Sequence, residues 1–441
     1  MESDVQGRQI PASPPMSLSI TPLDPWVADL LAREYPHRGY EISTDRIRSR
    51  KQIETAQAAL ISKLLSHAVS HSPFYKKRFE RFEKAPFTEL PFTLPSDLTA
   101  SESRFITVSQ SEIRRIVTIG TSGTVAAKRL FFTDEDLKAT EDFFLYGMST
   151  FTLPGSVVAV FMEGPAPDSI GWTLRSALGR LGCETLVFGL IHDPRVAAAW
   201  IDEHQPAVIV GLPGQLVLVA GRTLHSPEFV LLSADMATPS IRERIEERWK
   251  CTSFNHYGLT ESGWGCAVEC LARQGCHVRE FDILVEIIDS GGRSLPEGEW
   301  GEIVITMLRR LSFPLIRYRT GDEGRILPGP CPCGSPLKRV EILGRLPRKG
   351  AQGAPLRFYD VADSLWRMPW VEDFQASLRY GEGDVPEALN VTLAVTEPYE
   401  DTPDRTARRL RMVPGVPEEV NVLVEAGDSL PHRKPKRDWE N

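Results

Sequence analysis

The chain has 441 residues, of which 41% are hydrophobic and 25% are charged, and it carries a net charge of -8 at pH 7. This length exceeds the ~250 to 300 residues at which a single core stops growing, so we expect one large and one small domain. The acidic balance argues against a surface that grips nucleic acid, and the composition is that of a globular enzyme, unlike a disordered or membrane chain.

The first residues carry none of the signals of export or membrane insertion. Residues 1–25 contain no basic segment followed by an apolar one, and no run of ~18 apolar residues occurs later. We therefore expect a cytoplasmic protein with no membrane partner. Pro, Ser and polar residues dominate the start of the chain, so we expect residues 1–25 to lack fixed structure.

The next segment, up to about residue 81, has a helical pattern and is interpreted as a scaffold. In IETAQAALISKLLSHAV the apolar residues recur at nearly helical spacing, at Ile53, Ala56, Leu60, Leu64 and Val69.

Short apolar runs and amphipathic helical segments then alternate between residues 114 and 212. The runs RRIVTI, RLFFT, SVVAVFM, TLVFGLI and AVIVGL predict strands, and the alternation predicts an α/β core with a largely parallel sheet. A helix is expected from Asp134, because Thr133 and Asp136 form a capping pair. A second helix is expected at Thr238-Pro239, with apolar residues on one face.

Beyond residue 280 the pattern changes to strands and turns, as in FDILVEIID, SGGR and PEGEWGEIVITM. Gly, Pro and charged residues interrupt it at residues 344–355, which predicts a linker. We expect an α/β multidomain protein, with a large domain over 26–344 whose part from about 280 to 344 is β-rich. A small α+β domain is expected over 345–441.

The loop in TIGTSGTVAAKRLFFT, residues 118–133, is suited to phosphate. Thr121, Ser122, Gly123 and Thr124 offer hydroxyls and backbone N–H groups, and Lys128 and Arg129 add positive charge. The loop is not a Walker A motif, because strand-like residues follow where that motif requires a helix. From these residues alone, an exposed hairpin turn is an equally good interpretation.

Collinear segments over most of the chain resemble the adenylate-forming superfamily of acyl-CoA ligases, and within it the phenylacetate-CoA ligase and deazaflavin-cofactor adenylating branch. The segments are SHSPFYKKRFE, LPFTLPSDL, TSGT, NHYGLTESG, LPEGEWGEIVIT, PLIRYRTGD, the CPCG element and ILGR. Each is weak alone, but their common order is specific.

The resemblance implies a nucleotide site. Thr121, Ser122, Gly123 and Thr124 would contact the β- and γ-phosphates of ATP, with Lys128 assisting. The remaining roles fall on YGLTE, YRTGD, SADM and ILGR: Tyr257 and Gly258 beside the adenine, Thr260 near the α-phosphate, Glu261 holding Mg²⁺, Asp322 and Arg345 at the ribose, and Ser233 and Asp235 in the adenine wall.

These residue types suit the chemistry that the resemblance implies. A carboxylate attacks the α-phosphorus of ATP, so two anions approach each other and the site must neutralise charge without itself attacking. Glu261 is a hard oxygen ligand of the kind that Mg²⁺ prefers. A surface charge is the alternative interpretation of this residue.

Three segments depart from the family pattern. The family's C-terminal catalytic lysine matches Lys436, although Pro435 stands where glycine is usual; Lys434 is the fallback, and a solvated basic tail is the alternative. At the hinge, Leu346 follows Gly344-Arg345 in place of an acidic residue, which puts the second half-reaction in question. In the phosphate loop, Val125-Ala126 replaces the common Thr-Gly, which predicts slower ATP binding.

Cysteine and histidine residues in two segments predict a structural zinc site. GPCPCGS and ECLARQGCHVRE together supply five candidate ligands, of which four meet a zinc ion tetrahedrally. The resemblance implies the set Cys270, His277, Cys331 and Cys333, with Cys276 a substitute or a bystander. Reduced free thiols are the alternative, and we interpret Cys183, Cys251 and Cys266 in that way.

The aromatic residues Phe143, Phe144, Tyr146, His256 and Trp264 are candidates for an aryl-sized acyl pocket, and core packing explains them equally well. The leading hypothesis is an AMP-forming carboxylate-CoA ligase for an aromatic, phenylacetate-like acid, using ATP, Mg²⁺ and CoA. Two alternatives stay open: an adenylating enzyme with a non-CoA acceptor, and a nucleotide-binding protein without turnover. A homodimer is one open assembly state.

Overall fold

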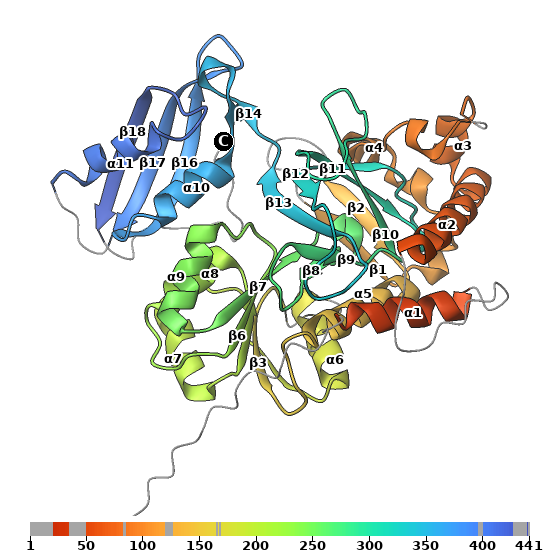
Figure 1. The fold of residues 1–441 in the computed structure, drawn as a ribbon, viewed down its shortest axis with the longest axis horizontal. Coiled ribbons are helices and arrows are strands. Elements are labelled where there is room, and N and C mark those ends of the chain that lie inside the picture. Colours follow the sequence, from red (N-terminus) through yellow and green to blue (C-terminus); the bar gives the residue numbers. More distant parts are fainter. Residues whose placement is uncertain are drawn as a thin grey trace, which may run out of the picture.

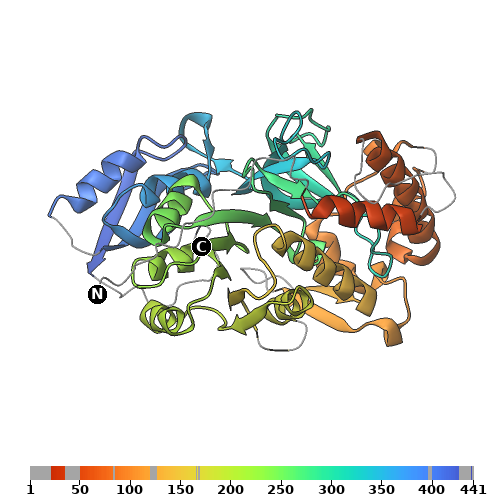
Figure 2. The same cartoon turned by 60° about the horizontal axis from the view of Figure 1, so that its bottom comes forward.

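The computed structural model describes residues 21–34, 50–82, 85–119, 127–164, 166, 169–395, 400–426 and 439. It confirms the predicted α/β class. A large mixed sheet with flanking helices forms the centre, N-terminal helices lie at one end, and a small sheet with two helices lies at the other (Figures 1 and 2).

The N-terminal scaffold is helical, as the sequence predicts. It comprises α1 (Leu23–Glu34), α2 (Arg50–His71), α3 (Pro73–Phe79) and α4 (Pro95–Ser101). Helix α1 begins inside the stretch 1–25 that was expected to lack structure. In α2 the first four predicted apolar positions are buried, but Val69 is 38% exposed and Ala68 takes its place in the core. The helical turn, at 3.6 residues, favours position 68 after Leu64.

Half of the large sheet is parallel, as expected of alternating strands and helices. Its strands are β3 (Val157–Phe161), β4 (Glu184–Val187), β5 (Val208–Gly211), β6 (Phe229–Leu232) and β7 (Thr252–Tyr257). The helices between them are α6 (Ile170–Arg180), α7 (Pro194–His204), α8 (Pro213–Ala220) and α9 (Pro239–Trp249). The predicted start of α9 is confirmed, because the Thr238 side chain accepts a hydrogen bond from the Ile241 N–H and Ile241, Ile245 and Trp249 are buried.

The other half of the sheet is antiparallel and corresponds to the predicted β-rich stretch. It contains β8 (Ala267–Glu269), β9 (Cys276–Val278), β10 (Ile283–Ile288), β11 (Gly301–Met307), β12 (Tyr318–Ile326) and β13 (Arg339–Arg345). The strand order across the whole sheet is β10-β11-β12-β13-β9-β8-β7-β6-β5-β3-β4. Strands β7 and β12 therefore lie in one sheet, although about 60 residues separate them in the chain.

A separate hairpin flanks the predicted phosphate loop. Strand β1 (Arg115–Ile119) pairs antiparallel with β2 (Lys128–Phe132), and Ile119 lies opposite Lys128 at the end of the strands that the connecting segment joins. Helix α5 (Asp134–Met148) follows, and its capping box of Thr133 and Asp136 is present as predicted. Residues 120–126 of the connecting segment lie outside the described residues.

The C-terminal segment forms a small α+β unit. Strands β16 (Val371–Tyr380), β17 (Pro386–Val395) and β18 (Glu419–Ala426) make a sheet, accompanied by α10 (Phe358–Trp366) and α11 (Thr402–Leu410). The expected irregular linker is wrong in part: β14 (Arg348–Lys349) and β15 (Pro355–Leu356) pair within it. Gly350 lies between them, and its position against the Gly415 backbone leaves no room for a side chain.

The C-terminal unit packs directly on α9. The backbone N–H and hydroxyl of Ser240, at the start of α9, donate to Asp363 Oδ1 at 3.0 and 2.7 Å. Arg244 Nη2 donates to the Met368 carbonyl at 2.7 Å, and apolar side chains of α9 and α10 belong to one buried cluster. This contact fixes the small unit beside α8 and α9 (Figure 1).

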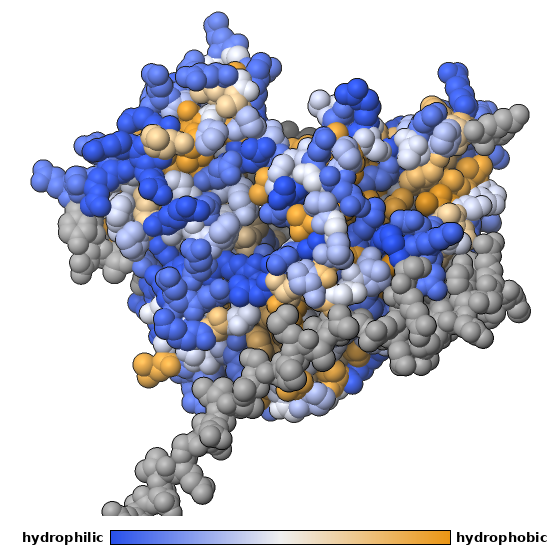
Figure 3. All heavy atoms as spheres, in the orientation of Figure 1, coloured by the Kyte–Doolittle hydropathy of each residue, from blue (hydrophilic) through white to orange (hydrophobic). Residues whose placement is uncertain are grey.

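The outer surface on the face in Figure 3 is largely hydrophilic, with hydrophobic residues in small scattered groups. Among the helices that the structure describes, none combines the length and apolarity needed to cross a bilayer.

Candidate active site

The carboxylate of Glu261 lies at the centre of a buried polar cluster. Glu261 lies shortly after β7, in the short 3-10 helix Thr260–Ser262, and only 6% of it is exposed. Its Oε1 accepts hydrogen bonds from Lys128 Nζ at 2.6 Å and from the Tyr318 hydroxyl at 2.8 Å. The three residues come from β2, the turn after β7, and β12. Lys128 and Glu261, which the resemblance assigns to the same nucleotide site, are therefore in direct contact.

Glu261 is ionised at neutral pH. Burial alone would raise the pKa of its carboxyl group, but the positive charge of Lys128 and the two hydrogen bonds outweigh burial, so the pKa lies below its ordinary value. Because the carboxylate is ionised, buried and held by neighbours, it provides a fixed negative charge next to the hairpin β1–β2.

A second polar group forms around Asp322 on β12. The Tyr257 hydroxyl donates to Asp322 Oδ2 at 2.8 Å, and Arg345 Nη1 lies 3.2 Å from Asp322 Oδ1. Asp322 faces Arg345 in the pairing of β12 with β13. The pKa of the Tyr257 hydroxyl is raised, first by burial and then by the charge of Asp322, so Tyr257 remains a hydrogen-bond donor.

The two polar groups are neighbours through both of the segments that build them. Tyr257 and Glu261 are four residues apart across the end of β7, and Tyr318 and Asp322 are four residues apart on β12. Tyr318 contacts Glu261 and Asp322 contacts Tyr257, so each pair joins β12 to the segment at the end of β7. The segments YGLTE and YRTGD thus converge.

The loop that begins at Ser233 adds a third wall. The Ser233 hydroxyl is 2.9 Å from His256 Nδ1, and Asp235 Oδ1 accepts the Met236 N–H at 2.8 Å. Burial and then the charge of Arg279 lower the pKa of His256 to about 4, so the imidazole is neutral at pH 7. Met236 in turn lies next to Gly344, at the end of β13.

A cavity of about 570 Å³ opens beside these groups. Its lining includes Ser233, Gly258 and Thr260 together with Phe143, Met148 and other apolar side chains. Lys128, Glu261 and Asp322 are not among the lining residues.

Gly258 is required at this turn. A Cβ atom there would lie 2.1 Å from the Trp264 carbonyl oxygen, far inside van der Waals contact. The close approach lets the backbone after β7 fold against the following loop.

Four of the five aromatic candidates line the cavity: Phe143, Phe144, His256 and Trp264. Tyr146 is the exception, because its ring stacks on Trp26 of α1 with centroids 5.5 Å apart. For Tyr146 the alternative interpretation, core packing, therefore holds, because its position along α5 directs it to the N-terminal helix.

Several predicted residues lie outside the described residues. These are Thr121, Ser122, Gly123, Thr124 and Val125-Ala126 of the loop, and Lys434, Pro435 and Lys436 near the C-terminus. Their roles remain predictions.

Sequence reasoning missed two residues that hold Glu261. Tyr318 is the first residue of YRTGD, a segment that the family resemblance assigns to the nucleotide site, so its membership in this segment was the signal that could have identified it. Arg310, which is 5% exposed, donates from Nη2 to the Phe131 carbonyl at 2.6 Å and from Nη1 to the Glu261 carbonyl at 3.2 Å. Arg310 therefore links β2 to the turn that contains Glu261, and no local pattern in the sequence predicts this role.

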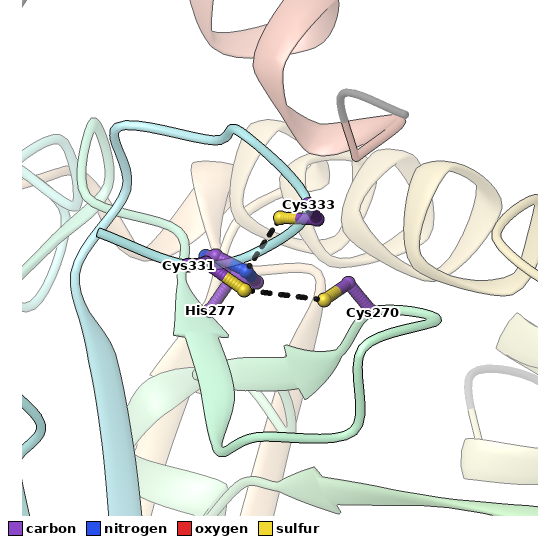
Figure 4. A group of neighbouring side chains, drawn as sticks. All are labelled: Cys270, His277, Cys331 and Cys333. Atoms are coloured by element: carbon purple, nitrogen blue, oxygen red, sulfur yellow. Dashed lines mark hydrogen bonds between the residues drawn. The ribbon is translucent and has the colours of Figure 1, made fainter. Parts of the chain in front are cut away.

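The predicted metal ligands also converge, away from the cavity. Cys270 and His277 lie at β8 and β9, Cys331 and Cys333 lie on the loop before β13, and all four are buried with ligand atoms within 4.8 Å of one another (Figure 4). Cys276 is separate, because its thiol donates to the Asn255 carbonyl at 3.4 Å.

The distances fit a tetrahedral ion. Cys270 Sγ is 3.7 Å from Cys331 Sγ, and Cys333 Sγ is 3.4 Å from His277 Nε2. Ligands bound to zinc at ~2.3 Å for sulfur and ~2.0 Å for nitrogen would be separated by about these amounts. His277 Nδ1 lies 3.2 Å from the Leu337 carbonyl, which leaves Nε2 to face the thiols.

Comparison with known proteins gives consistent matches. Residues 177–307 match the family model described as AMP-binding enzyme. A phenylacetate-coenzyme A ligase of Thermus thermophilus is 27% identical over 379 residues, which make up 79% of this chain and 83% of that protein. A second, from Pseudomonas putida, is 28% identical over 305 residues, covering 64% and 68%.

Solved structures share the fold. A 2-hydroxyisobutyryl-CoA ligase in its postadenylation state superposes with a TM-score of 0.76 at 20% identity, covering 88% of each chain. The same ligase in its thioesterification state gives 0.62, covering 89% and 91%.

The chain is therefore similar to AMP-binding enzymes over residues 177–307 and to phenylacetate-coenzyme A ligases over most of its length, and it shares its fold with a solved acyl-CoA ligase. It is phenylacetate-CoA ligase-like in sequence, in agreement with the resemblance of the collinear motifs.

Proposed function

We propose that the protein is an AMP-forming carboxylate-CoA ligase that acts on an aromatic, phenylacetate-like acid. In the first step an oxygen of the acid attacks the α-phosphorus of ATP, and the bond to the bridging oxygen breaks to release pyrophosphate. In the second step the CoA thiol, having lost its proton, attacks the acyl carbon, and AMP leaves with the former carboxylate oxygen. The names of the relatives support both steps.

The convergence of Glu261, Lys128 and Asp322 next to the turn with Gly258 and Thr260, which lines an apolar cavity, carries this proposal. A nucleotide needs charged and hydrogen-bonding groups, whereas the body of an organic acid needs an apolar chamber, and the junction between them is where the acid meets phosphorus. The cavity reaches the motif at Thr260, which would approach the α-phosphate.

The remaining residues have matching roles in this scheme. Lys128 neutralises phosphate charge with Thr121 to Thr124, Tyr257 and Gly258 lie beside the adenine with Ser233 and Asp235, and Asp322 accepts hydrogen bonds from the ribose with Arg345 assisting. Lys436 stabilises charge in the transition state of the first step. Asp322 beside the donor Tyr257 suits a ribose, since hydroxyl groups donate to carboxylates.

Magnesium fits Glu261. The carboxylate is ionised and already surrounded by donors, so its oxygens present the hard negative ligand that Mg²⁺ prefers. When bound, the ion neutralises phosphate charge. Lys128 occupies Oε1, and we expect its Nζ to move toward phosphate oxygens when nucleotide and metal are present.

Zinc fits the cluster of Cys270, His277, Cys331 and Cys333. Four protein ligands and no open position define a structural site, which would join the β8–β9 hairpin to the loop before β13. Metal analysis of the purified protein tests this: about one zinc per chain is expected, with loss in Cys331→Ser and retention in the control Cys276→Ser. A zinc-free wild-type protein would end the proposal.

Transfer to a non-CoA acceptor is the second candidate. The observation that favours it is the hinge, where Leu346-Pro347 follows Arg345 and proline restricts the backbone next to the residues that must rotate. The contacts of α10 with α9 would also have to break in that rotation. A cytoplasmic location and a homodimer remain predictions.

Exchange of labelled pyrophosphate into ATP tests the first step, and AMP release tests the second. We expect exchange only when an acid is present, and AMP release that accelerates with CoA. Exchange without any response to CoA would favour the second candidate, and no exchange with any acid of a broad panel would refute adenylation.

A further inference from the structure

Trp264 has a backbone conformation that a tryptophan rarely adopts. Its φ is +61°, in the left-handed region, where a side chain meets its own backbone and glycine is the usual residue. Two glycines flank the position, at 263 and 265, so the surrounding loop is already built for tight backbone. A bulky residue persists in such a conformation only when its side chain makes contacts that compensate.

The contacts of the Trp264 indole form one wall of the cavity. The ring stacks on Phe132 of β2 with centroids 4.9 Å apart, and the Arg115 guanidinium lies 5.2 Å from the ring centre. Trp264 nevertheless lines the cavity and is only partly buried. One part of this flat aromatic surface is therefore fixed by Phe132, and another part is available to a ligand.

The next residue brings a second aromatic ring to the same wall. A Cβ at Gly265 would lie 2.3 Å from the Phe143 ring, so only glycine lets Phe143 approach the chain at this position. Phe143 also lines the cavity and is 1% exposed. The dipeptide Trp264-Gly265 thus positions two rings at the cavity. The strained backbone of Trp264 positions its own indole, and the absence of a side chain at Gly265 makes room for the ring of Phe143.

Much of the cavity lining is apolar, and one position on it has no side chain. Met148, Leu174 and Val210 are buried lining residues, and methionine adapts its shape to irregular partners. Gly147 also lines the cavity, inside helix α5, where glycine is less favourable than alanine. Among the described atoms, those within 4 Å of an added Cβ all belong to Val268, the nearest at 3.4 Å. An alanine would fit, so the space beside Gly147 is open.

The charged residues on the lining are few. Among the described lining residues, Arg115 and Glu163 carry charge, and Arg115 lies over the indole while Glu163 is exposed. Apart from Arg115 and Glu163, the described lining offers no charged partner for a second carboxylate or an amine on the acid, and burial of such a group away from these two residues would be unfavourable.

We propose that the acid is an aryl acid with an apolar ring substituent and no charged group besides its carboxylate. Its ring lies against Trp264, and its substituent fills the space that Gly147 leaves open. This inference rests on the proposed function for the identity of the cavity as an acyl site. Trp264 is then the residue that selects for a flat ring, and Gly147 sets the permitted length.

Calorimetric titration of acids into the AMP-bound full-length protein tests the proposal without requiring turnover. The probes are phenylacetate, 4-propylphenylacetate and octanoate, which has the same number of carbons as phenylacetate. We expect the order of affinity 4-propylphenylacetate, phenylacetate, octanoate. Trp264→Ala should weaken both aryl acids about three- to tenfold, the worth of one aromatic contact, and leave octanoate nearly unchanged. Trp264→Phe should restore most of the difference.

Gly147→Ala gives an independent test in a variant that the geometry predicts to fold. We expect weaker binding of 4-propylphenylacetate by at least tenfold, with phenylacetate within twofold of the wild type. Trp172→Ala is the control, because Trp172 lies on α6, is 44% exposed and does not line the cavity; it should change nothing. Thermal unfolding of each variant verifies its fold.

Equal binding of all three acids by the wild type would overturn the proposal, as would a Gly147→Ala variant with unchanged preference. Failure of the proposed function has a different signature. Aryl acids would then bind with the expected order while pyrophosphate exchange is absent, which would refute adenylation and leave the recognition of the ring intact.

Discussion

The proposed binding site has a nucleotide end, which is the polar cluster around Glu261, and an acyl end, which is the apolar cavity, and the two differ in what holds them. At the nucleotide end, Glu261, Lys128, Tyr318 and Asp322 are fixed by charge and hydrogen bonds of 2.6 to 2.8 Å. At the acyl end, Trp264 and Gly147 act through shape, by a strained backbone and a missing side chain. The comparison teaches that the chemistry of the reaction is encoded in residue types, whereas the choice of acid is encoded in how the chain is packed around them.

The largest effect should come from Glu261→Gln, which keeps the shape and removes the charge. We expect pyrophosphate exchange to fall by about 10²- to 10³-fold, because a fixed group that acts on transition-state charge is lost. Exchange kinetics at saturating acid measure the loss. The control is Glu297→Gln, whose partner Lys338 lies at the surface; if both variants lost activity equally, the charge of Glu261 would not be the cause.

Lys436→Ala should lower adenylation by ~10²-fold if its charge meets the transition state. Parallel measurement of Lys434→Ala decides between the two candidate lysines. An unchanged rate in both variants would exclude the tail from the first step.

The nucleotide end should also show a stability effect that the acyl end does not. Lys128→Met leaves the Glu261 carboxylate buried without its cation, and we expect a loss of about 3 kcal/mol in the free energy of unfolding at pH 7. The folded pKa of Glu261 lies below 4.5, so the stability that its charge contributes is present above pH 4.5 and is lost as the pH falls through the folded pKa. Urea unfolding of both proteins across this range measures the difference, which should shrink at low pH; a gap that is constant with pH would contradict the ion pair.

The smallest effect should come from Tyr257→Phe, which removes one hydrogen bond to Asp322 and keeps the ring. We expect about a fivefold rise in KM for ATP with little change in kcat, since one such bond is worth about 1 kcal/mol. An unchanged KM for ATP would separate Asp322 from nucleotide binding.

The same contrast explains how far the sequence alone could be interpreted. Local signals predicted the capping box at Thr133 and the start of α9, because each depends on neighbouring residues. A role for Tyr318 in the site could have been predicted from the sequence, since Tyr318 belongs to the same YRTGD segment as Asp322. The role of Arg310 and the conformation of Trp264 depend on segments that meet only in the folded chain, and no local pattern reports them. Tyr146 shows the same limit, because only the position of α1 decides where its ring packs.

The most direct test of the account follows the oxygen atoms. An aryl acid labelled with ¹⁸O in both carboxylate oxygens is turned over with ATP and CoA, and the AMP is examined by mass spectrometry. If the acid attacks the α-phosphorus, each AMP carries one ¹⁸O and the pyrophosphate carries none. Unlabelled AMP, or label in the pyrophosphate or inorganic phosphate, would contradict the claim that these segments direct an organic acid to the innermost phosphorus of ATP.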